Sequence, residues 1–448
     1  MKNNAGLREA AIADSAMAKA GWRIVPLLAL SYLIAYMDRV NIGFAATQMN
    51  EDLKFSATIY GLGGGFFFLS YSLFEIPSNL LLLRFGARRW IARIMITWGL
   101  LAAGMMFVRT PVQFYVLRFL IGMAEAGFFP GVIYYLSGWF PYRYRGRALS
   151  RFYLAGPLAS VVMGVLSGWL LALDGSGGLR GWQWLFLVQG LPAVGVGLIV
   201  LRFLPENPAT ANWLTSPERD WLTSELAADA ARIGDPPSHS VLSQLRHPRV
   251  RQLAAISVLT ISAFYAFTLS APVLLKEGTG LQTSSIGYLV SLGGILGALT
   301  MWATGWLSDH RGDRYLPLLA GFLAEAVALF TFALAPSTLA VILAYLLFSA
   351  AWTAVTLAQV MIWADVFHIR VLAVSSAAIN TAAQMGAFFA PSLFGWAHDA
   401  TGGYKAGLFV LPFACLLALA LSVQLRRQVN GSRETKGGAI LAPHPDGP

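Results

Sequence analysis

The chain has 448 residues, of which 56% are hydrophobic and 12% charged, and its formal net charge is +10. About one quarter of the residues of a soluble globular protein are charged, so this composition indicates a protein solvated mainly by lipid. In a membrane protein an excess of Lys and Arg marks the cytoplasmic loops, so we expect no nucleic-acid partner. The single cysteine, Cys415, excludes an intrachain disulfide and a metal site built from cysteines.

The apolar residues fall into segments long enough to cross a bilayer, which takes about 20 residues per helix. We therefore predict an all-α membrane protein with twelve transmembrane helices, and the lipid bilayer as its surroundings. The spans lie near 22–47, 58–83, 90–108, 111–139, 148–172, 184–204, 250–275, 284–307, 315–334, 338–364, 371–397 and 405–425. They form an N-terminal half (22–204) and a C-terminal half (250–425), flanked by cytoplasmic tails (1–21 and 426–448).

A polar stretch, 205–249, separates the two halves. Ser216 followed by Pro217 is typical of a helix start. Trp213, Trp221 and Leu222 can share one apolar stripe, so we expect a short amphipathic helix lying on the membrane surface. Arginines gather in the even-numbered connections and beside both termini, and the positive-inside rule then places both termini in the cytoplasm.

A weak internal repeat relates the halves. The segment after the second span, NLLLLRFGARR (79–89), is similar to the segment after the eighth, GWLSDHRGDR (305–314). The fifth and eleventh spans contain the related runs LSGWLL (166–171) and LFGWAH (393–398). Two related six-helix halves are typical of transporters that rock around a central site.

Asp38 and Arg39 are neighbours inside the first span. A charged group in the hydrocarbon core costs at least about 2.5–3.5 kcal/mol, so each must be paired or must face water. Successive helical residues point about 100° apart, which places Arg39 with Tyr36 and puts Asp38 on a neighbouring face. Arg39 suits a carboxylate ligand, because its planar guanidinium binds two oxygens at once, and Asp38 suits a proton site. The alternative is a structural clamp to other helices.

Further ionisable residues fall inside predicted spans. Arg118 and Glu125 are two helical turns apart in the fourth span, so they share a face. We predict Glu125 as a second proton site, and the alternative is a salt bridge with Arg118 that only fixes packing. In the second span Tyr71 lies one turn from Glu75 and can donate its hydroxyl to a carboxylate, although many buried tyrosines bond only to the backbone.

The predicted spans of the C-terminal half are almost free of charge. Among their polar residues we predict Trp352, Thr353, Asn380 and Gln384 as substrate contacts, and the alternative for each is a role in helix packing. The sequence contains no nucleotide-binding loop, catalytic triad or metal motif, and its six histidines form no cluster. We therefore expect no cofactor and no metal, and an ion gradient as the source of energy.

The repeated loops and the two-half layout resemble the major facilitator superfamily. The second loop matches the cytoplasmic signature of that family well. The first departs from it, with Leu83 in place of the usual Asp and Asn79 in place of the usual Gly. The resemblance implies a conformational gate formed by Arg84, Arg88, Asp309 and Arg311.

Within that superfamily the chain resembles the anion:cation symporter family over nearly its full length. The matching runs are YMDRVNIGFA (36–45), EIPSNLLLLRFGARRWIARIMITWG (75–99), RFLIGMAEAGFFPGVIYYLSGWFP (118–141), GLRGWQWLFLVQGLPA (178–193) and PENPATANWLTSPERDWL (205–222). Together these runs are specific. The similarity is greatest to bacterial permeases for tartrate and aromatic acids.

The resemblance implies two sets of residue roles. The substrate carboxylate is held by Arg39 and Tyr71 with Tyr36 beside them, and Asn380 is a polar contact. The protons bind at Asp38 and Glu125, with Arg118 as the residue that pairs with them. Sugar-acid members carry a glutamine where this chain has Pro157, so a shorter hydroxy-diacid or an aromatic acid is favoured.

We therefore predict import of a small organic anion, tartrate first, by proton symport with alternating access. The transporter would act as a monomer in a bacterial inner membrane. The alternatives within this fold are a permease for aromatic or sugar acids, an exporter and a proton-independent exchanger. A membrane-embedded enzyme or sensor would need a reactive cluster or an appended soluble domain, and the sequence shows neither.

Overall fold

The computed structural model describes residues 2–438 apart from 234–246, 312, 336 and 368, and every regular element in this part of the chain is a helix. The N-terminal half contains α2 (Val25–Leu53), α3 (Ala57–Phe85), α4 (Ala87–Gly104), α5 (Pro111–Glu125), α6 (Phe128–Ser137), α7 (Tyr142–Tyr153), α8 (Ala155–Leu171) and α9 (Gly181–Phe203). The C-terminal half contains α12 (Pro248–Thr279), α13 (Thr283–Arg311), α14 (Tyr315–Leu334), α15 (Thr338–Val366), α16 (Ile369–Thr401) and α17 (Lys405–Gly438). Helix α1 (Lys2–Arg23) precedes the first half, and α10 (Ser216–Ile233) follows it.

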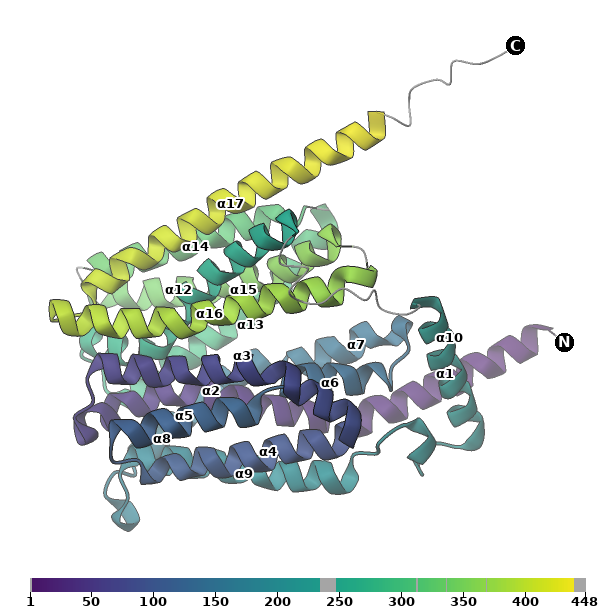
Figure 1. Cartoon of the computed structure of the whole chain (residues 1–448), viewed down its shortest axis with the longest axis horizontal. Coiled ribbons are helices and arrows are strands. Elements are labelled where there is room, and N and C mark those ends of the chain that lie inside the picture. Colours follow the sequence, from purple (N-terminus) through teal and green to yellow (C-terminus); the bar gives the residue numbers. More distant parts are fainter. Residues whose placement is uncertain (1, 234–246, 312, 336, 368, 439–448) are drawn as a thin grey trace.

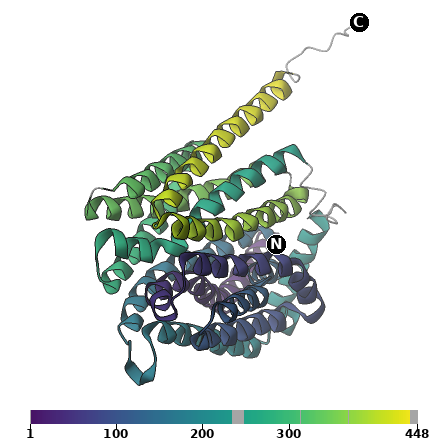
Figure 2. The same ribbon diagram turned by 60° about the vertical axis from the view of Figure 1, so that its left-hand side comes forward.

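The two halves are helix bundles that lie side by side, as Figures 1 and 2 show. Among the described residues, 11 segments are long and apolar enough to cross a membrane. The remaining span is α16, which has no Asp, Glu, Lys or Arg from Val371 to His398. The prediction of an all-α protein with twelve transmembrane helices in two halves is confirmed.

The fourth and fifth spans are each broken in the middle. The fourth was expected as one helix over 111–139, but α5 ends at Glu125 and α6 begins at Phe128. Gly127 between them has φ +83°, and Pro130 has no N–H to donate to the carbonyl four residues earlier. In the fifth span Pro157 has the same effect one turn after the junction of α7 and α8 at Leu154.

Helix α10 packs on protein. Its apolar side chains were expected on the membrane surface, but Leu214 and Leu222 are buried and Trp213 stacks on Trp139 at 5.5 Å. Glu218 accepts hydrogen bonds from Lys19 of α1 at 2.7 Å, so α1 and α10 are joined where they cross in Figure 1. The amphipathic pattern was interpreted correctly as a helix, but the apolar surface that covers it belongs to the N-terminal half.

The halves touch at one end of the molecule. We call the end that holds both chain termini and α10 the terminus side, and the other end the opposite side (Figure 1). Near the opposite side α3 packs on α16 and α8 packs on α13, with glycines at the closest approaches. A Cβ at Gly395 would overlap the Ala57 carbonyl, and one at Gly164 would overlap the Gly287 carbonyl. We call these two contacts the seam.

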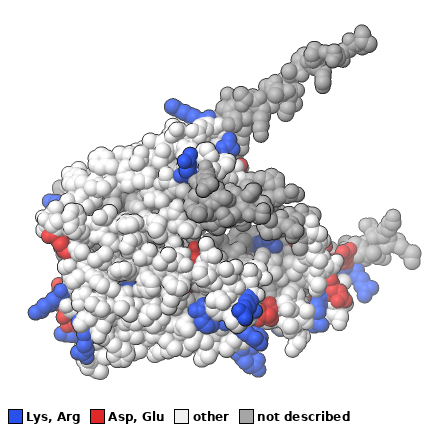
Figure 3. Space-filling model, in the orientation of Figure 1, with Lys and Arg blue, Asp and Glu red and all other residues white. Residues whose placement is uncertain are grey.

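Figure 3 shows Lys, Arg, Asp and Glu gathered toward the two ends of the molecule, with a largely uncharged belt between them. Large apolar side chains such as Trp302 and Leu83 are exposed along the bundle. A belt of this kind is covered by the hydrocarbon core of a membrane, in which charged groups are costly. The same view shows a hollow between the two halves toward the terminus side.

Candidate functional site

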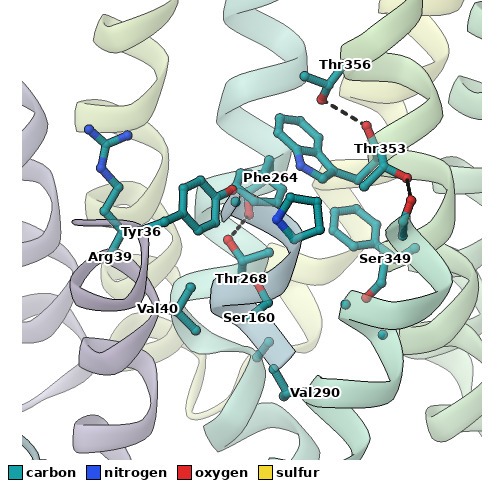
Figure 4. A pocket seen from close by; sticks show the side chains of 18 of the residues that line it. Tyr36, Arg39, Val40, Ser160, Phe264, Thr268, Val290, Ser349, Thr353 and Thr356 are labelled. Carbon is teal, nitrogen blue, oxygen red and sulfur yellow. Dashed lines mark hydrogen bonds between the residues drawn. The ribbon is translucent and has the colours of Figure 1, made fainter. Parts of the chain in front are cut away.

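A cavity of about 290 Å³ lies between the two halves, near the lower end of the range for small-molecule sites. Its walls come from α2, α7 and α8 of the first half and from α12, α13 and α15 of the second. Figure 4 shows Arg39 and Tyr36 on one side and Phe264, Ser349 and Thr353 on the facing helices. Tyr153 lines the cavity and is 42% exposed, so the cavity reaches the surface, and the hollow between the two halves in Figure 3 opens toward the terminus side.

Arg39 is the one charged residue among the described residues that line this cavity. Its guanidinium forms a salt bridge with Glu125 of α5, with Nη2 and Nε at 2.7 Å and 3.0 Å from Oε1. The ring of Tyr71 lies 5.2 Å from the guanidinium carbon. Since a guanidinium has further N–H donors, Arg39 can hold a carboxylate that enters the cavity.

Glu125 is the last residue of α5, directly before the break in the fourth span. Glycine is required at Gly127, because φ there is +83° and an added Cβ would lie 2.5 Å from Ser78 Oγ. Glu125 is 1% exposed, and its Oε2 has no hydrogen-bond partner within the described structure. A buried carboxylate oxygen without a partner is costly, and it is the atom at which a proton can bind.

Asp38 faces away from the cavity, into the first half. Its carboxylate accepts a hydrogen bond from the Trp98 indole at 3.1 Å and another from the Asn41 amide at 3.1 Å. Asn41 also donates to Gln189 of α9. The adjacent residues therefore point in different directions, with Arg39 at the cavity and Asp38 inside the first half, as the helical spacing predicted.

Arg118 lies between these groups without a direct ion pair. Its Nε donates to the Gly63 carbonyl at 3.3 Å, and its guanidinium carbon lies 4.7 Å from the centre of the Phe67 ring. No acid of the described structure comes within the 4.0 Å of a salt bridge to it. Its strongest attractive charge interaction is with Asp38. The alternative considered for Glu125 was a salt bridge with Arg118, but the salt bridge of Glu125 is formed with Arg39.

The C-terminal half contributes mainly aromatic and hydroxyl side chains. Trp352 and Thr353, two of the predicted substrate contacts, line the cavity, and Trp352 stacks on Phe264 with ring centres 3.7 Å apart. Asn380 and Gln384 do not line it: Asn380 is exposed, and Gln384 is half-buried with a buried, unpartnered Oε1 in the described structure. Their role as substrate contacts stays a prediction.

Sequence reasoning missed several cavity residues. Tyr265 of α12 packs on Phe68 of the first half with ring centres 4.1 Å apart, and it interacts electrostatically with Arg39. The ring of Tyr32 also lines the cavity. Its signal was present, because Tyr32, Tyr36 and Arg39 lie four and three residues apart on one stripe of α2. Other aromatic lining residues are Phe44, Tyr153, Phe264, Tyr345 and Phe348.

The gate residues expected from the repeated loops lie outside the cavity. Arg88 lies 3.5 Å from Glu206, in the segment that follows α9. Arg84 and Arg311 are exposed. The side chain of Asp309 lies outside the described part of the structure. The gate therefore stays a prediction.

Comparisons with known proteins identify the family to which this chain belongs. Residues 28–391 match the family model described as Major Facilitator Superfamily. A protein of Agrobacterium vitis named "Putative tartrate transporter" is 40% identical over 93% of this chain and 93% of its own length. The inner membrane transport protein RhmT of Escherichia coli is 31% identical over 93% of this chain and 96% of its own. The crystal structure of a bacterial homolog of the human lysosomal transporter Spinster has a similar fold, with a TM-score of 0.75 at 17% identity, over 91% of this chain and 97% of that one.

Proposed function

Because this chain belongs to the Major Facilitator Superfamily and is a multi-pass membrane transporter, we propose that it carries a small organic carboxylate together with a proton. The observation that supports this best is the Arg39–Glu125 salt bridge at the wall of the cavity. The name of the 40% identical relative supports tartrate or a related organic anion as the substrate class. RhmT supports an inner-membrane location.

The carboxylate of the substrate and the carboxylate of Glu125 compete for Arg39. A proton that binds at Glu125 Oε2 removes the negative charge that holds Arg39, and Arg39 is then free to bind the substrate. Loss of that proton restores the salt bridge, which displaces the substrate. This exchange couples the two movements, because proton and anion bind together and leave together.

Alternating access follows from the two-half architecture. The conformer described here is closed at the seam and accessible from the terminus side, which the positive-inside rule identifies as the cytoplasm. Uptake from outside requires the seam to open and the halves to close over the terminus side. One chain supplies the lining of this cavity, which is compatible with transport by a monomer.

Two substrate classes fit the observations differently. The relative's name supports a hydroxy-dicarboxylate such as tartrate. The cavity favours an aromatic monocarboxylate, because a second carboxylate finds no second cation among the described lining residues. Aromatic rings such as Phe264 and Trp352 would instead pack against a flat substrate.

Proteoliposomes test both parts of the proposal. Purified protein is assayed for uptake of labelled tartrate and labelled 4-hydroxyphenylacetate, with and without an acidic exterior. We expect the acidic exterior to drive accumulation of at least one of them, and Glu125→Gln to abolish that accumulation. An equal uptake with and without the acidic exterior would contradict proton coupling. A Glu125→Gln variant that accumulates substrate normally would contradict the role of Glu125.

A further inference from the structure

The two buried carboxylates of the site have opposite hydrogen-bond surroundings. Both oxygens of Asp38 accept hydrogen bonds, one from the Trp98 indole at 3.1 Å and one from the Asn41 amide nitrogen at 3.1 Å. An indole N–H and an amide N–H are donors only, so neither can accept a hydrogen bond from a protonated carboxyl group. A proton on Asp38 would therefore face donors at both oxygens, whereas Glu125 has an oxygen with no partner in the described structure.

Gln189 fixes the orientation of the Asn41 amide. Asn41 Nδ2 also donates to Gln189 Oε1, while Gln189 Nε2 lies 2.9 Å from Met163 Sδ. If the Asn41 amide turned over, its carbonyl oxygen would face the carbonyl oxygen of Gln189, and both are acceptors. Asp38, Asn41, Gln189 and Trp98 are 4%, 1%, 5% and 1% exposed, so this network is shielded from bulk water.

The charges of the site balance in pairs. Arg39 pairs with Glu125, while Asp38 and Arg118 have their strongest attractive charge interactions with each other. These four groups carry no net charge when both acids are ionised, and they and a monocarboxylate at Arg39 carry none when Glu125 has taken up a proton. Glu75 of α3 also interacts with Arg39, but it is half-buried and lies outside these two pairs. Protonation of Asp38 would leave Arg118, which is 3% exposed, as an unbalanced buried cation.

We propose that Asp38 stays ionised through the whole transport cycle as the fixed counter-charge of Arg118. Trp98, Asn41 and Gln189 are then its positioning residues. This inference rests on the proposed function and narrows the sequence prediction, in which both acids carried protons. Of the two, Glu125 alone is the carrier, and one proton moves with each substrate molecule.

The other charged or titratable groups that face Glu125 do not change this count. Arg39 and Arg118 stay protonated, since a guanidinium does not lose its proton in proteins. Tyr71 of α3 and Tyr265 of α12 are phenols, which stay protonated at neutral pH. A monocarboxylate then crosses with one proton and no net charge, and tartrate crosses with one net negative charge.

Counterflow separates the two acids, because exchange of internal for external substrate needs no net proton movement. Glu125→Gln should keep counterflow and lose pH-driven accumulation. Asp38→Asn should lose both by at least about tenfold, since it leaves Arg118 unbalanced. The double variant Asp38→Asn/Arg118→Gln restores neutrality, and it should recover counterflow at least about fivefold over Asp38→Asn. Thermal unfolding in detergent shows whether each variant is folded.

Trp98→Phe tests the positioning role without removing a charge. It deletes one donor to Asp38, so protonation at acid pH becomes easier, and counterflow relative to that of the unaltered protein at the same pH should fall between about pH 7 and pH 5. Trp182→Phe is the matched control, because the Trp182 indole is equally buried and donates to Asp52 at 3.0 Å, outside the site. It should leave the pH profile unchanged.

The proton-to-substrate ratio completes the test. For labelled tartrate, the voltage that stops net flux at a fixed pH gradient gives the charge moved per cycle. For labelled 4-hydroxyphenylacetate, one proton per substrate moves no net charge, so net flux should be independent of voltage. One proton per substrate supports the inference. Two protons, an Asp38→Asn variant that behaves like Glu125→Gln, or a double variant no better than Asp38→Asn would overturn it while leaving proton symport in place. If the unaltered protein shows no pH-driven accumulation, the proposed function fails and this inference fails with it.

Discussion

Asp399, near the C-terminal end of α16, caps a helix that belongs to the other half. Its carboxylate accepts hydrogen bonds from the backbone N–H of Ala57 at 3.2 Å and of Thr58 at 2.9 Å, in the first turn of α3. These bonds can exist only while the seam is closed. Replacing Asp399 with Ala should therefore destabilise this conformer relative to one in which the seam is open.

The size of the effect follows from the two bonds. A net hydrogen bond to a charged group contributes about 1.5–3 kcal/mol, and we take about 1 kcal/mol for each because 31% of the Asp399 side chain is exposed. The loss of about 2 kcal/mol changes the ratio of the two conformers about 30-fold. The estimate is a difference between states, so it does not require that the protein as a whole become less stable.

The protonation state of Asp399 gives this prediction a pH signature. Burial acts to raise the pKa of Asp399, but hydrogen bonds from Thr58 and His398 hold it below its ordinary value. The capping contribution is therefore complete above the ordinary carboxyl range and is lost only as the pH falls through the lowered pKa. Acidification from about pH 8 to about pH 5 should leave the seam closed.

A cysteine at the seam reports its opening. Cys415 is the single native cysteine and is buried, so Cys415→Ala gives a silent background. Ser291 of α13 is 6% exposed and its hydroxyl donates to the Val161 carbonyl of α8 at 2.8 Å. Ser291→Cys should react with a membrane-impermeant maleimide, added from the opposite side, about 30-fold faster when Asp399→Ala is also present.

The control is a carboxylate that caps a helix within one half. Asp174 accepts from the backbone N–H of Gly181 at 2.9 Å, at the start of α9. Asp174→Ala removes a similar cap on the same side of the molecule but does not change a contact between halves. Labelling of the Ser291→Cys reporter should therefore stay at the background rate. Equal labelling with Asp399→Ala and Asp174→Ala would refute the reasoning.

Three further substitutions test other parts of the structure. Gly127→Ala forces an alanine to φ +83° with its Cβ 2.5 Å from Ser78 Oγ, which should cost about 1–3 kcal/mol and lower the thermal midpoint, while Gly104→Ala, with no atom within 4 Å, should not. Arg39→Lys loses the planar fork, so the KM for the carboxylate should rise about 10- to 100-fold, and an unchanged KM would remove Arg39 from the anion site. Burial acts to raise the pKa of Glu218, but hydrogen bonds from Lys19, Ser15 and Thr215 lower it to about 2. The contact between α1 and α10 is therefore complete above the ordinary carboxyl pKa and is lost as the pH falls through about 2. Glu218→Gln should weaken that contact by about 1 kcal/mol at neutral pH and speed proteolysis of α1, and equal cleavage rates would contradict this role.

The fold could be predicted because hydropathy is a local property. Each span shows its own apolar run, and the charged loops mark the ends of the spans. The breaks after Glu125 and Tyr153 were harder, although Gly127, Pro130 and Pro157 were visible, because a membrane helix tolerates glycine and proline when neighbouring helices supply the missing hydrogen bonds. The surface that covers α10 could not be predicted, since an amphipathic stripe fits lipid and protein equally well.

The site could be predicted in part, for the same reason. The energetic cost of Asp38, Arg39, Arg118 and Glu125 identified them as exceptional before any helix was placed. Which acid pairs with which base depends on how α2, α4 and α5 pack, and periodicity within one helix does not contain that information. Glu325 of α14 escaped notice altogether: it is 1% exposed, lies 3.6 Å from the Cys415 sulfur and takes part in none of the salt bridges of the described residues.

Tyr265 is the residue through which the C-terminal half reaches the charges of the N-terminal half. Its hydroxyl interacts electrostatically with Arg39 and its ring packs on Phe68, so both contacts change if the halves rock. Tyr265→Phe keeps the ring contact and removes the hydroxyl that faces this charge. The KM for the carboxylate should rise at an unchanged thermal midpoint, while Tyr345→Phe, a change to another tyrosine of the same cavity, should alter it little. Equal KM values for Tyr265→Phe and the unaltered protein would mean that Arg39 is positioned by its own half alone.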